Sequence, residues 1–99
     1  GTNPEQLIAA AHAGCVAMAH IVELEGAGYT ADTLEASAKV HMDKEGDGWA
    51  INKVELTLDA RVPDISEDEF DKLANGAKEG CPVSKLLNAE ITLEYTLNG

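Results

Sequence analysis

The fold of this chain is decided by residues 3–28, which read NPEQLIAAAHAGCVAMAHIVELEGAG. Asn3 is a preferred helix N-cap, Pro4 suits the first helical position, and Gln6 stands where a capping box places Glu or Gln. The following apolar residues recur at steps of three and four: Leu7, Ala11, Cys15, Met18 and Val22. Glycines end the run. The pattern predicts a helix of about 22 residues, and its many alanines favour a central position because they let another backbone approach closely.

Two segments with an alternating pattern follow, at residues 33–42 and 49–62. Apolar residues at every second position predict two strands, and a slip in the alternation near Lys53 predicts a β-bulge. The acidic, Gly-containing stretch between the segments is predicted to be a hairpin loop. It imitates the start of a calcium-binding EF-hand loop, but Val54 occupies the twelfth position, where a bidentate Glu is required.

The rest of the chain predicts two helical segments and a last strand. Ser66 and Glu69 form a capping box ahead of an amphipathic helix that ends at Gly80. Residues 82–87 predict one or two further helical turns, and residues 89–97 alternate as a strand. Since no strand–helix–strand unit repeats, we predict one α+β domain over residues 1–99, with a long central helix and a second helix packed on a mostly antiparallel sheet.

Length and charge narrow the classes of function. A domain of 99 residues buries only about two-thirds of its unfolded surface, so we expect a homodimer. The chain has 18 Asp and Glu against 7 Lys and Arg, a formal charge of −11, which disfavours nucleic acid and anionic membranes as partners. No apolar run approaches the roughly 20 residues that cross a bilayer, and no leader opens the chain. We therefore expect a soluble, cytoplasmic protein.

The two cysteines are the first candidate site residues. Cys15 lies on the apolar stripe of the first helix, where it is either a small buried hydrophobe or a reactive thiol. Cys81 precedes Pro82 and suits an N-cap, where the first amides and the helix dipole favour a thiolate; the alternative is an ordinary cap or a half-buried thiol. His12 could act as a base, although a core histidine is the commoner case. Neither a Cys-x-x-Cys nor a closely spaced His pair occurs, so we predict no metal and no cofactor.

Glu5 is a further candidate, ten residues before Cys15. Ten helical residues turn through about 1000°, which leaves Glu5 roughly 80° from Cys15 around the axis. A pocket shared by the two residues therefore needs another element or another subunit. The alternative role for Glu5 is a first-turn carboxylate that the helix dipole stabilises.

Several of these segments together resemble the OsmC/Ohr family of thiol peroxidases. Residues 3–7 (NPEQL) and 11–15 (AHAGC) are similar to the family's first signature. Residues 80–84 (GCPVS) and 89–93 (AEITL) resemble its second Cys region and last strand, and 48–51 (GWAI) also fits. The resemblance covers essentially the whole chain, and the context of His12 and of Cys-Pro-Val-Ser is closer to the OsmC branch.

The resemblance implies a homodimeric α+β fold with active sites at the subunit interface. It implies that Cys15 attacks a hydroperoxide and becomes a sulfenic acid, that Cys81 condenses with it to a disulfide, and that a dithiol reductant opens that disulfide. Organic hydroperoxides are the typical substrates, and some OsmC members also take hydrogen peroxide. Glu5 matches the family glutamate that pairs with a catalytic arginine. The apolar stripe of Leu7, Ala11 and Met18 is expected to be core; the alternative is that it lines a pocket for an alkyl tail. The alternative function is a non-enzymatic redox sensor or interaction module.

The residues and the resemblance disagree on one point. Local physics makes Cys81 the better thiolate, because Cys15 lies too deep in its helix to feel the N-terminal dipole. Cys15 then needs a cation, but Arg61 is the only arginine and stands in no motif that matches the family arginine. In the family that arginine comes from preceding N-terminal strands. We therefore expect this chain to lack that strand region and to be feebly active alone.

Overall fold

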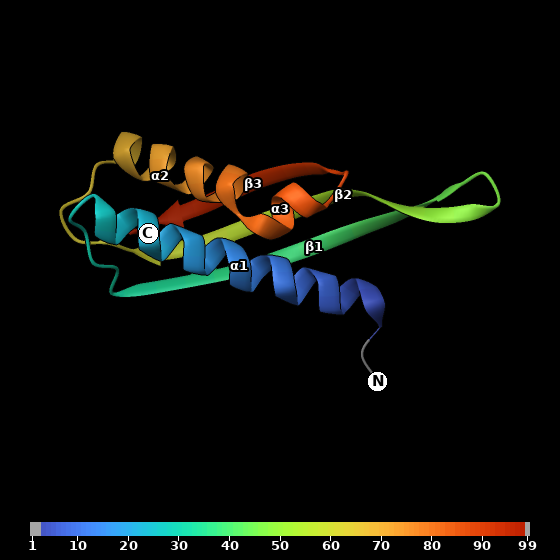
Figure 1. Ribbon diagram of the computed structural model, residues 1–99. Helices are drawn as coiled ribbons and strands as arrows, with labels where there is room; N and C mark the ends of the chain where they lie inside the picture. Colours follow the sequence, from blue (N-terminus) through green and yellow to red (C-terminus); the bar gives the residue numbers. More distant parts are fainter. Residues whose placement is uncertain (1–2, 99) are drawn as a thin grey trace.

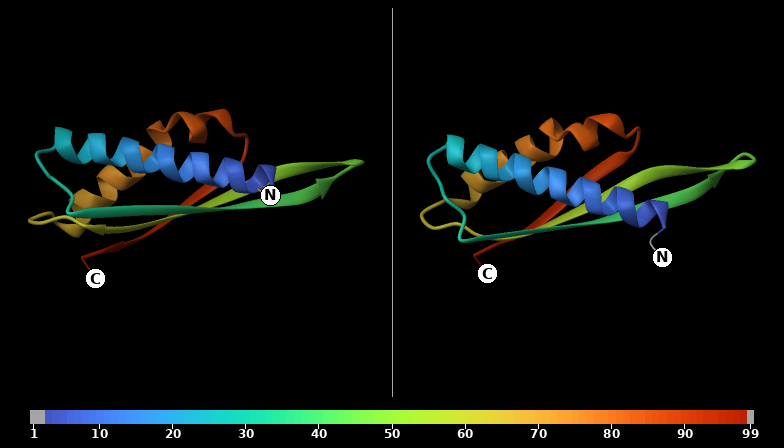
Figure 2. Two further views of the ribbon diagram at one scale, coloured as in Figure 1. Left: turned by 90° about the horizontal axis from the view of Figure 1, so that it is seen from below. Right: turned by 60° about the horizontal axis from the view of Figure 1, so that its bottom comes forward.

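The computed structural model describes residues 3–98 and has two layers, with the helices on one face of a three-stranded sheet (Figures 1 and 2). The elements follow in the order α1 (Pro4–Gly26), β1 (Thr33–Glu45), β2 (Gly48–Arg61), α2 (Glu67–Gly80), α3 (Pro82–Leu86) and β3 (Glu90–Leu97). This is the predicted α+β architecture, with each predicted element present. The far end of the β1–β2 hairpin extends past the helices (Figure 1).

The helix ends form where the capping residues predict them. The Asn3 side chain accepts a hydrogen bond of 2.8 Å from the Gln6 amide at the start of α1. The Ser66 hydroxyl accepts one of 3.1 Å from the Glu69 amide at the start of α2. Each bond satisfies one of the amides that a helix N-terminus leaves without an intrahelical partner.

The sheet is mixed. Its strand order is β1-β2-β3, in which β1 and β2 are antiparallel and β3 lies parallel to β2. The predicted antiparallel pairing is therefore correct for β1 and β2 and does not hold for β3. The last strand is parallel to β2 because α2 and α3 form a crossover connection, which returns the chain toward the end of the sheet from which β2 runs.

The hairpin contains the predicted bulge but lacks the predicted long loop. The register shifts between His41 and Met42, which pair with Lys53 and Ile51, so Asn52 is the extra residue. The strands continue to a two-residue turn at positions 46–47, where Gly46 has a φ of 61°. The acidic residues that were predicted to form a loop therefore extend β1. A glycine at positive φ permits this tight turn.

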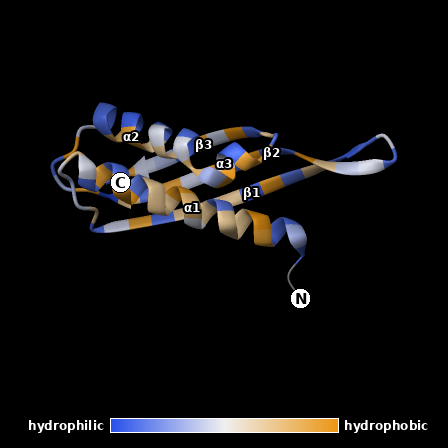
Figure 3. Cartoon of the chain, in the orientation of Figure 1, coloured by the Kyte–Doolittle hydropathy of each residue, from blue (hydrophilic) through white to orange (hydrophobic). Residues whose placement is uncertain are grey.

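The core lies between the sheet and the helices. Alternate residues of β2 face it, and α2 adds one side of its helix; the buried members are Val54, Leu56, Leu58, Ala60, Phe70, Leu73, Ala74 and Ala77. The opposite side of α2 carries polar colours in Figure 3. This agrees with the amphipathic pattern that predicted α2.

The prediction that the apolar stripe of α1 lies in the core is wrong, and Ala11 and Met18 of that stripe line an open groove instead. The side that packs into the core carries His12, Val16, His20 and Leu24. Three members of the predicted stripe are exposed instead: Leu7 at 60%, Met18 at 71% and Val22 at 69%. The physical reason is visible in Figure 3, where apolar residues occur along much of α1. When a helix is apolar on several sides, its periodicity does not identify the side that is buried.

α1 is also long and apolar enough, by length and composition alone, to cross a membrane. The expectation that no apolar run approaches that length is therefore wrong. In this fold, however, α1 packs against β1 and α2 and contributes four buried side chains, so it is the core helix of the domain.

Candidate active site

Cys15 and Cys81 meet although they are 66 residues apart in the chain. Their Sγ atoms are 2.7 Å apart, and both cysteines are free thiols. A covalent S–S bond is about 2.05 Å long, so a small closing motion would join them. Cys15 comes from the middle of α1, and Cys81 is the single residue between α2 and α3.

The backbone on both sides fixes Cys81. Its amide donates to the Ala77 carbonyl at the end of α2, at 2.9 Å, and its carbonyl accepts from the Lys85 amide in α3, at 3.1 Å. Its φ of −62° and ψ of 126° are extended, as the following Pro82 requires. The residue therefore ends one helix and begins the next. Its side chain is 0% exposed.

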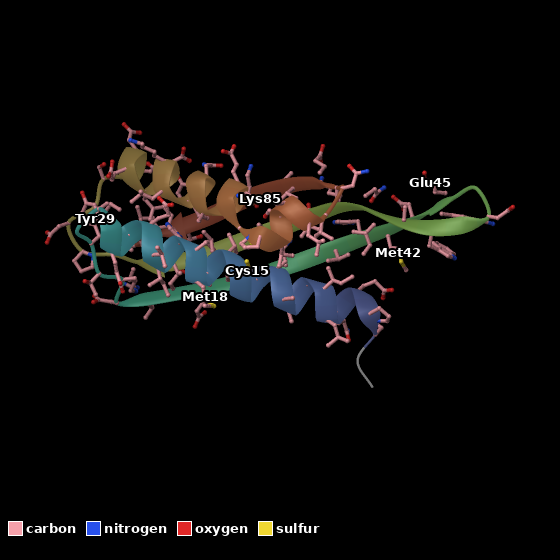
Figure 4. The ribbon with its side chains drawn as sticks, viewed as in Figure 1. Cys15, Met18, Tyr29, Met42, Glu45 and Lys85 are labelled. Carbon is pink, nitrogen blue, oxygen red and sulfur yellow. The ribbon has the colours of Figure 1, made fainter. Side chains whose placement is uncertain are left out.

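Cys15, by contrast, lies at an open apolar groove. The groove has a volume of about 570 Å³ and is lined by Ala10, Ala11, Gly14, Cys15, Met18, Ala19, Val22 and Pro82. Cys81 is not part of this lining. In Figure 4, Cys15 lies on the flank of α1 beside α3, and Met18 projects from α1 on the other side. Cys15 is therefore the cysteine next to the groove, and Cys81 lies behind it.

A second contact, between polar side chains, joins α1 to α3 close to the cysteine pair. His12 Nε2 lies 2.7 Å from Ser84 Oγ, and the His12 ring is fully buried. Burial lowers the pKa of His12, so the imidazole is neutral near pH 7. His12 was a candidate from its place in the sequence, whereas Ser84 was not. The only signal for Ser84 was its place in the Cys-Pro-Val-Ser segment.

The two thiols differ in pKa. Burial raises the pKa of Cys15, and its hydrogen bond with Cys81 raises it further against a smaller opposing effect of the Val83 amide. Burial also raises the pKa of Cys81, but hydrogen bonds from Cys15, from the amide and hydroxyl of Ser84 and from the Val83 amide outweigh it and lower the pKa overall. The Cys81 side chain makes no cap hydrogen bond of standard geometry to α3, so these contacts act together rather than through one strong bond.

Cys81 is therefore the member of the pair that ionises more readily, as its position before Pro82 predicted. Geometry alone allows either sulfur to donate across the 2.7 Å contact. Since Cys81 has the lowered pKa and Cys15 the raised one, we take Cys15 as the donor.

The described residues do not bring Glu5 to the cysteine pair. Glu5 lines a different, shallow depression at the start of α1, together with Gln6, Lys39 and Met42 among others. Ten helical residues also separate it from Cys15 by about 15 Å along the axis. Arg61 lies at the end of β2, where it pairs with Thr33 and its carbonyl accepts from the Asp32 amide.

Comparison with known proteins supplies the family. Residues 1–96 match the family model described as OsmC-like protein. The chain is 48% identical over 97 residues to peroxiredoxin OsmC of Escherichia coli (strain K12), an alignment that covers 98% of this chain and 68% of that protein.

Solved structures agree. The crystal structure of the organic hydroperoxide resistance protein OhrB of Bacillus subtilis superposes with a TM-score of 0.76 at 33% identity, covering 97% of this chain and 71% of that one. An OsmC-like protein of Vibrio cholerae O1 biovar eltor str. N16961 superposes with a TM-score of 0.85 at 19% identity, covering 97% and 65%, and shows the fold alone. The chain spans about two thirds of the length of these relatives. It belongs to the OsmC-like family of Cys-based, thiol-dependent peroxidases.

Proposed function

We propose that Cys15 and Cys81 are the redox-active pair with which this chain reduces organic hydroperoxides. The observation that carries the proposal is the position of the two sulfurs. One lies at an open apolar groove, and the other is buried 2.7 Å behind it. A hydroperoxide that enters the groove meets Cys15 first, and the product of that reaction has a second thiol within bonding reach.

The proposed reaction has two steps. The Cys15 thiolate attacks the terminal peroxide oxygen, the O–O bond breaks, and the leaving alkoxide takes a proton to become an alcohol, which leaves Cys15 as a sulfenic acid. The Cys81 sulfur then attacks the sulfenic sulfur, and water leaves as the disulfide forms. Two thiols are thereby oxidised to one disulfide while one hydroperoxide is reduced to an alcohol and water. A dithiol reductant returns the pair to the thiol form.

Access and ionisation favour different cysteines in this scheme. Cys15 is the cysteine at the groove, but its raised pKa disfavours its thiolate, whereas the lowered pKa of Cys81 favours ionisation of Cys81. The short contact offers a path by which the Cys15 proton passes to Cys81. A cation beside Cys15 would favour that transfer. In the matched family motif Glu5 holds such a cation, an arginine, and we propose the same role for Glu5. Because Glu5 lines a separate depression, this role needs another element or a second subunit between them.

The groove supports an organic substrate. Its lining consists of Ala, Gly, Met, Val and Pro side chains around Cys15, without a charged group. An alkyl tail gains about 25 cal/mol for each Å² that it buries there, whereas hydrogen peroxide has no apolar surface to bury. We therefore expect an alkyl or aryl hydroperoxide to react faster than hydrogen peroxide.

We further propose that this single domain forms a homodimer and works in the cytoplasm. Large apolar side chains remain exposed in one copy: Met18 at 71%, Val22 at 69%, Trp49 at 68% and Leu86 at 79%. A second copy would cover such side chains. Free, cycling thiols suit a reducing compartment. Light scattering after size exclusion tests the dimer, and a monomer at tens of micromolar would contradict it.

Single-turnover oxidation tests the assignment of the cysteines. The wild type, Cys15→Ser and Cys81→Ser would each receive one equivalent of cumene hydroperoxide and a sulfenic-acid trap, followed by intact mass measurement. We expect a disulfide in the wild type, a trapped adduct in Cys81→Ser and no adduct in Cys15→Ser. An adduct in Cys15→Ser alone would assign the peroxide reaction to Cys81 instead.

The alternative is a redox sensor of the same fold. A sensor would form the disulfide once and recover slowly, whereas an enzyme would cycle and consume dithiol in proportion to peroxide. Repeated additions of hydroperoxide in the presence of dihydrolipoamide separate the two. Loss of further peroxide consumption after the first equivalent would favour the sensor.

A further inference from the structure

We propose that the Cys15–Cys81 disulfide opens in one direction: the reducing thiolate attacks the Cys15 sulfur, and Cys81 leaves as a thiolate that Ser84, positioned by His12, stabilises. The inference rests on the proposed function, because it describes how the oxidised pair is reduced. It adds two positioning residues, His12 and Ser84, to the two cysteines.

The first support is access. A reducing thiolate must approach one sulfur of the disulfide from outside. Cys15 lines the open groove, while Cys81 is 0% exposed and lies behind it between α2 and α3. The backbone of Cys81 is also held on both sides, by Ala77 and by Lys85, so the residue does not move outward as a whole without breaking those bonds. Attack on Cys15 needs no such rearrangement.

The second support is the position of Ser84 in the first turn of α3, three residues after Cys81. Its hydroxyl helps to lower the pKa of Cys81, and Ser84 Oγ lies 2.7 Å from His12 Nε2. A hydroxyl has one proton to donate, so if Ser84 donates to the Cys81 sulfur it must accept from His12. That requires the His12 tautomer with its proton on Nε2.

The buried His12 ring is consistent with this tautomer. Its Nδ1 has no hydrogen-bond partner among the described residues. With the proton on Nε2, Nδ1 is an unpaired acceptor, which is less unfavourable in a buried site than an unpaired N–H donor. In the other tautomer a buried N–H would be unpaired, and the Ser84 proton would point at His12 instead of Cys81. The observed contacts therefore favour donation from His12 through Ser84 to Cys81.

The third support is the chemistry of exchange. Thiol–disulfide exchange is faster when the leaving thiol has the lower pKa. The pKa of Cys81 in the reduced pair is lowered by the Cys15 thiol, by the amide and hydroxyl of Ser84 and by the Val83 amide. When Cys15 is bonded to the reductant, its thiol no longer donates, so the groups of Ser84 and Val83 are the ones left to favour the departing Cys81 thiolate. In the balanced step the incoming thiolate forms an S–S bond to Cys15, the Cys15–Cys81 bond breaks, and its electron pair goes to the Cys81 sulfur. The second thiol of the reductant then releases Cys15 as it closes its own disulfide.

The direction can be read from a trapped intermediate. The disulfide would be formed in two ways, with cumene hydroperoxide and with diamide, and then treated briefly with glutathione and quenched with N-ethylmaleimide. Peptide mass measurement is expected to place glutathione on Cys15 and maleimide on Cys81. Glutathione on Cys81 at the earliest times would overturn the inference. Because diamide does not depend on peroxide chemistry, a failure of the proposed peroxidase function would appear only in the cumene hydroperoxide sample.

Variants of Ser84 test the positioning role. We expect Ser84→Ala to slow opening of the diamide-formed disulfide by glutathione about tenfold or more, since a hydrogen bond to a charged group is lost. Ser84→Thr keeps a hydroxyl and is expected to retain most of the rate. Ser37→Ala, on an exposed position of β1, is the matched control and should open like the wild type.

A second measurement separates this role from a general loss of structure. In a Cys15→Ser background, thiolate absorbance near 240 nm follows the ionisation of Cys81. Ser84→Ala should move that titration to higher pH, and Ser84→Thr should restore it. Equal rates for Ser84→Ala and Ser37→Ala, or equal slowing by Ala and Thr at position 84, would overturn the role of the hydroxyl.

Discussion

His20 makes the stability of this fold sensitive to acid. The side chain is 0% exposed, and neither ring nitrogen has a hydrogen-bond partner among the described residues. Its ring packs at an angle against Phe70, with centroids 4.8 Å apart. Burial lowers the pKa of His20 from 6.5 to about 4. We predict that replacing this residue by leucine, which has a similar volume and does not titrate, removes much of the acid sensitivity.

The sign and size follow from proton linkage. In the unfolded chain His20 takes up a proton below about pH 6.5, whereas in the folded chain it stays neutral until about pH 4. Between these values the unfolded state binds one more proton, so the free energy of unfolding falls as the pH falls, by about 1.4 kcal/mol per pH unit. Across the whole interval the loss is about 3 kcal/mol, and it is absent above the upper value.

Urea unfolding of the reduced protein between pH 7.5 and 4 measures this effect. At pH 7.5 His20→Leu should differ little from the wild type, because losing the ring contact with Phe70 and removing unpaired polar nitrogens oppose each other. At pH 4 the variant should be more stable by about 3 kcal/mol relative to that starting difference. Other titrating groups, including His12, are common to both proteins and cancel.

Val16→Ala is the matched control. It empties a buried, non-titrating position on the same side of α1, so it should lower stability by an amount that does not change with pH. If the wild-type and His20→Leu curves run parallel from pH 7.5 to 4, His20 is not the acid-sensitive group and the reasoning is refuted.

Three further outcomes are expected in unfolding experiments. Asn98→Ala should cost about 2 kcal/mol, because the Asn98 side chain accepts from the Val62 amide at 2.9 Å and donates to its carbonyl at 3.1 Å; a cost near zero would mean that water replaces both bonds. Phe70→Ala should cost about 3–5 kcal/mol, against under 0.5 for Ser37→Ala at an exposed position of β1, and similar costs for both would contradict the assigned core. Oxidation to the proposed disulfide, across a sequence separation of 66 residues, should raise the free energy of unfolding by about 4 kcal/mol, and Cys15→Ser should show no such gain under the same oxidant.

The structural features that depend on only a few neighbouring residues, namely the helix caps and the β-bulge, were predicted correctly from the sequence. Asn3 and Ser66 cap the helices that they were expected to cap, and their hydrogen bonds join residues three apart. The slip near Lys53 became a bulge at Asn52. Each of these features depends on local backbone geometry, which side chains of neighbouring residues determine.

Features that depend on what surrounds an element were missed. α1 is apolar on more than one side, so the side that carries Met18 and Val22 was predicted to be core and is exposed instead. The core side carries His12 and His20, which a rule based on hydrophobicity would place outside. The contact between His12 and Ser84 joins residues 72 apart. No spacing rule reports such a pair, because only the packing of α3 on α1 creates it.

The residues predicted that Cys81 is the better thiolate, whereas the resemblance implied that Cys15 attacks the peroxide. These two predictions conflicted because each considered one cysteine in its own segment. Cys81 has the hydrogen bonds that favour a thiolate, but it is buried. Cys15 has a raised pKa, but it is the cysteine that lines the groove. A catalytic cycle needs both properties at different steps, since the sulfur that meets the peroxide must be accessible and the sulfur that leaves the disulfide must be stable as a thiolate. A pair that divides these properties across 2.7 Å can serve both steps with only the small closing motion that forms the disulfide.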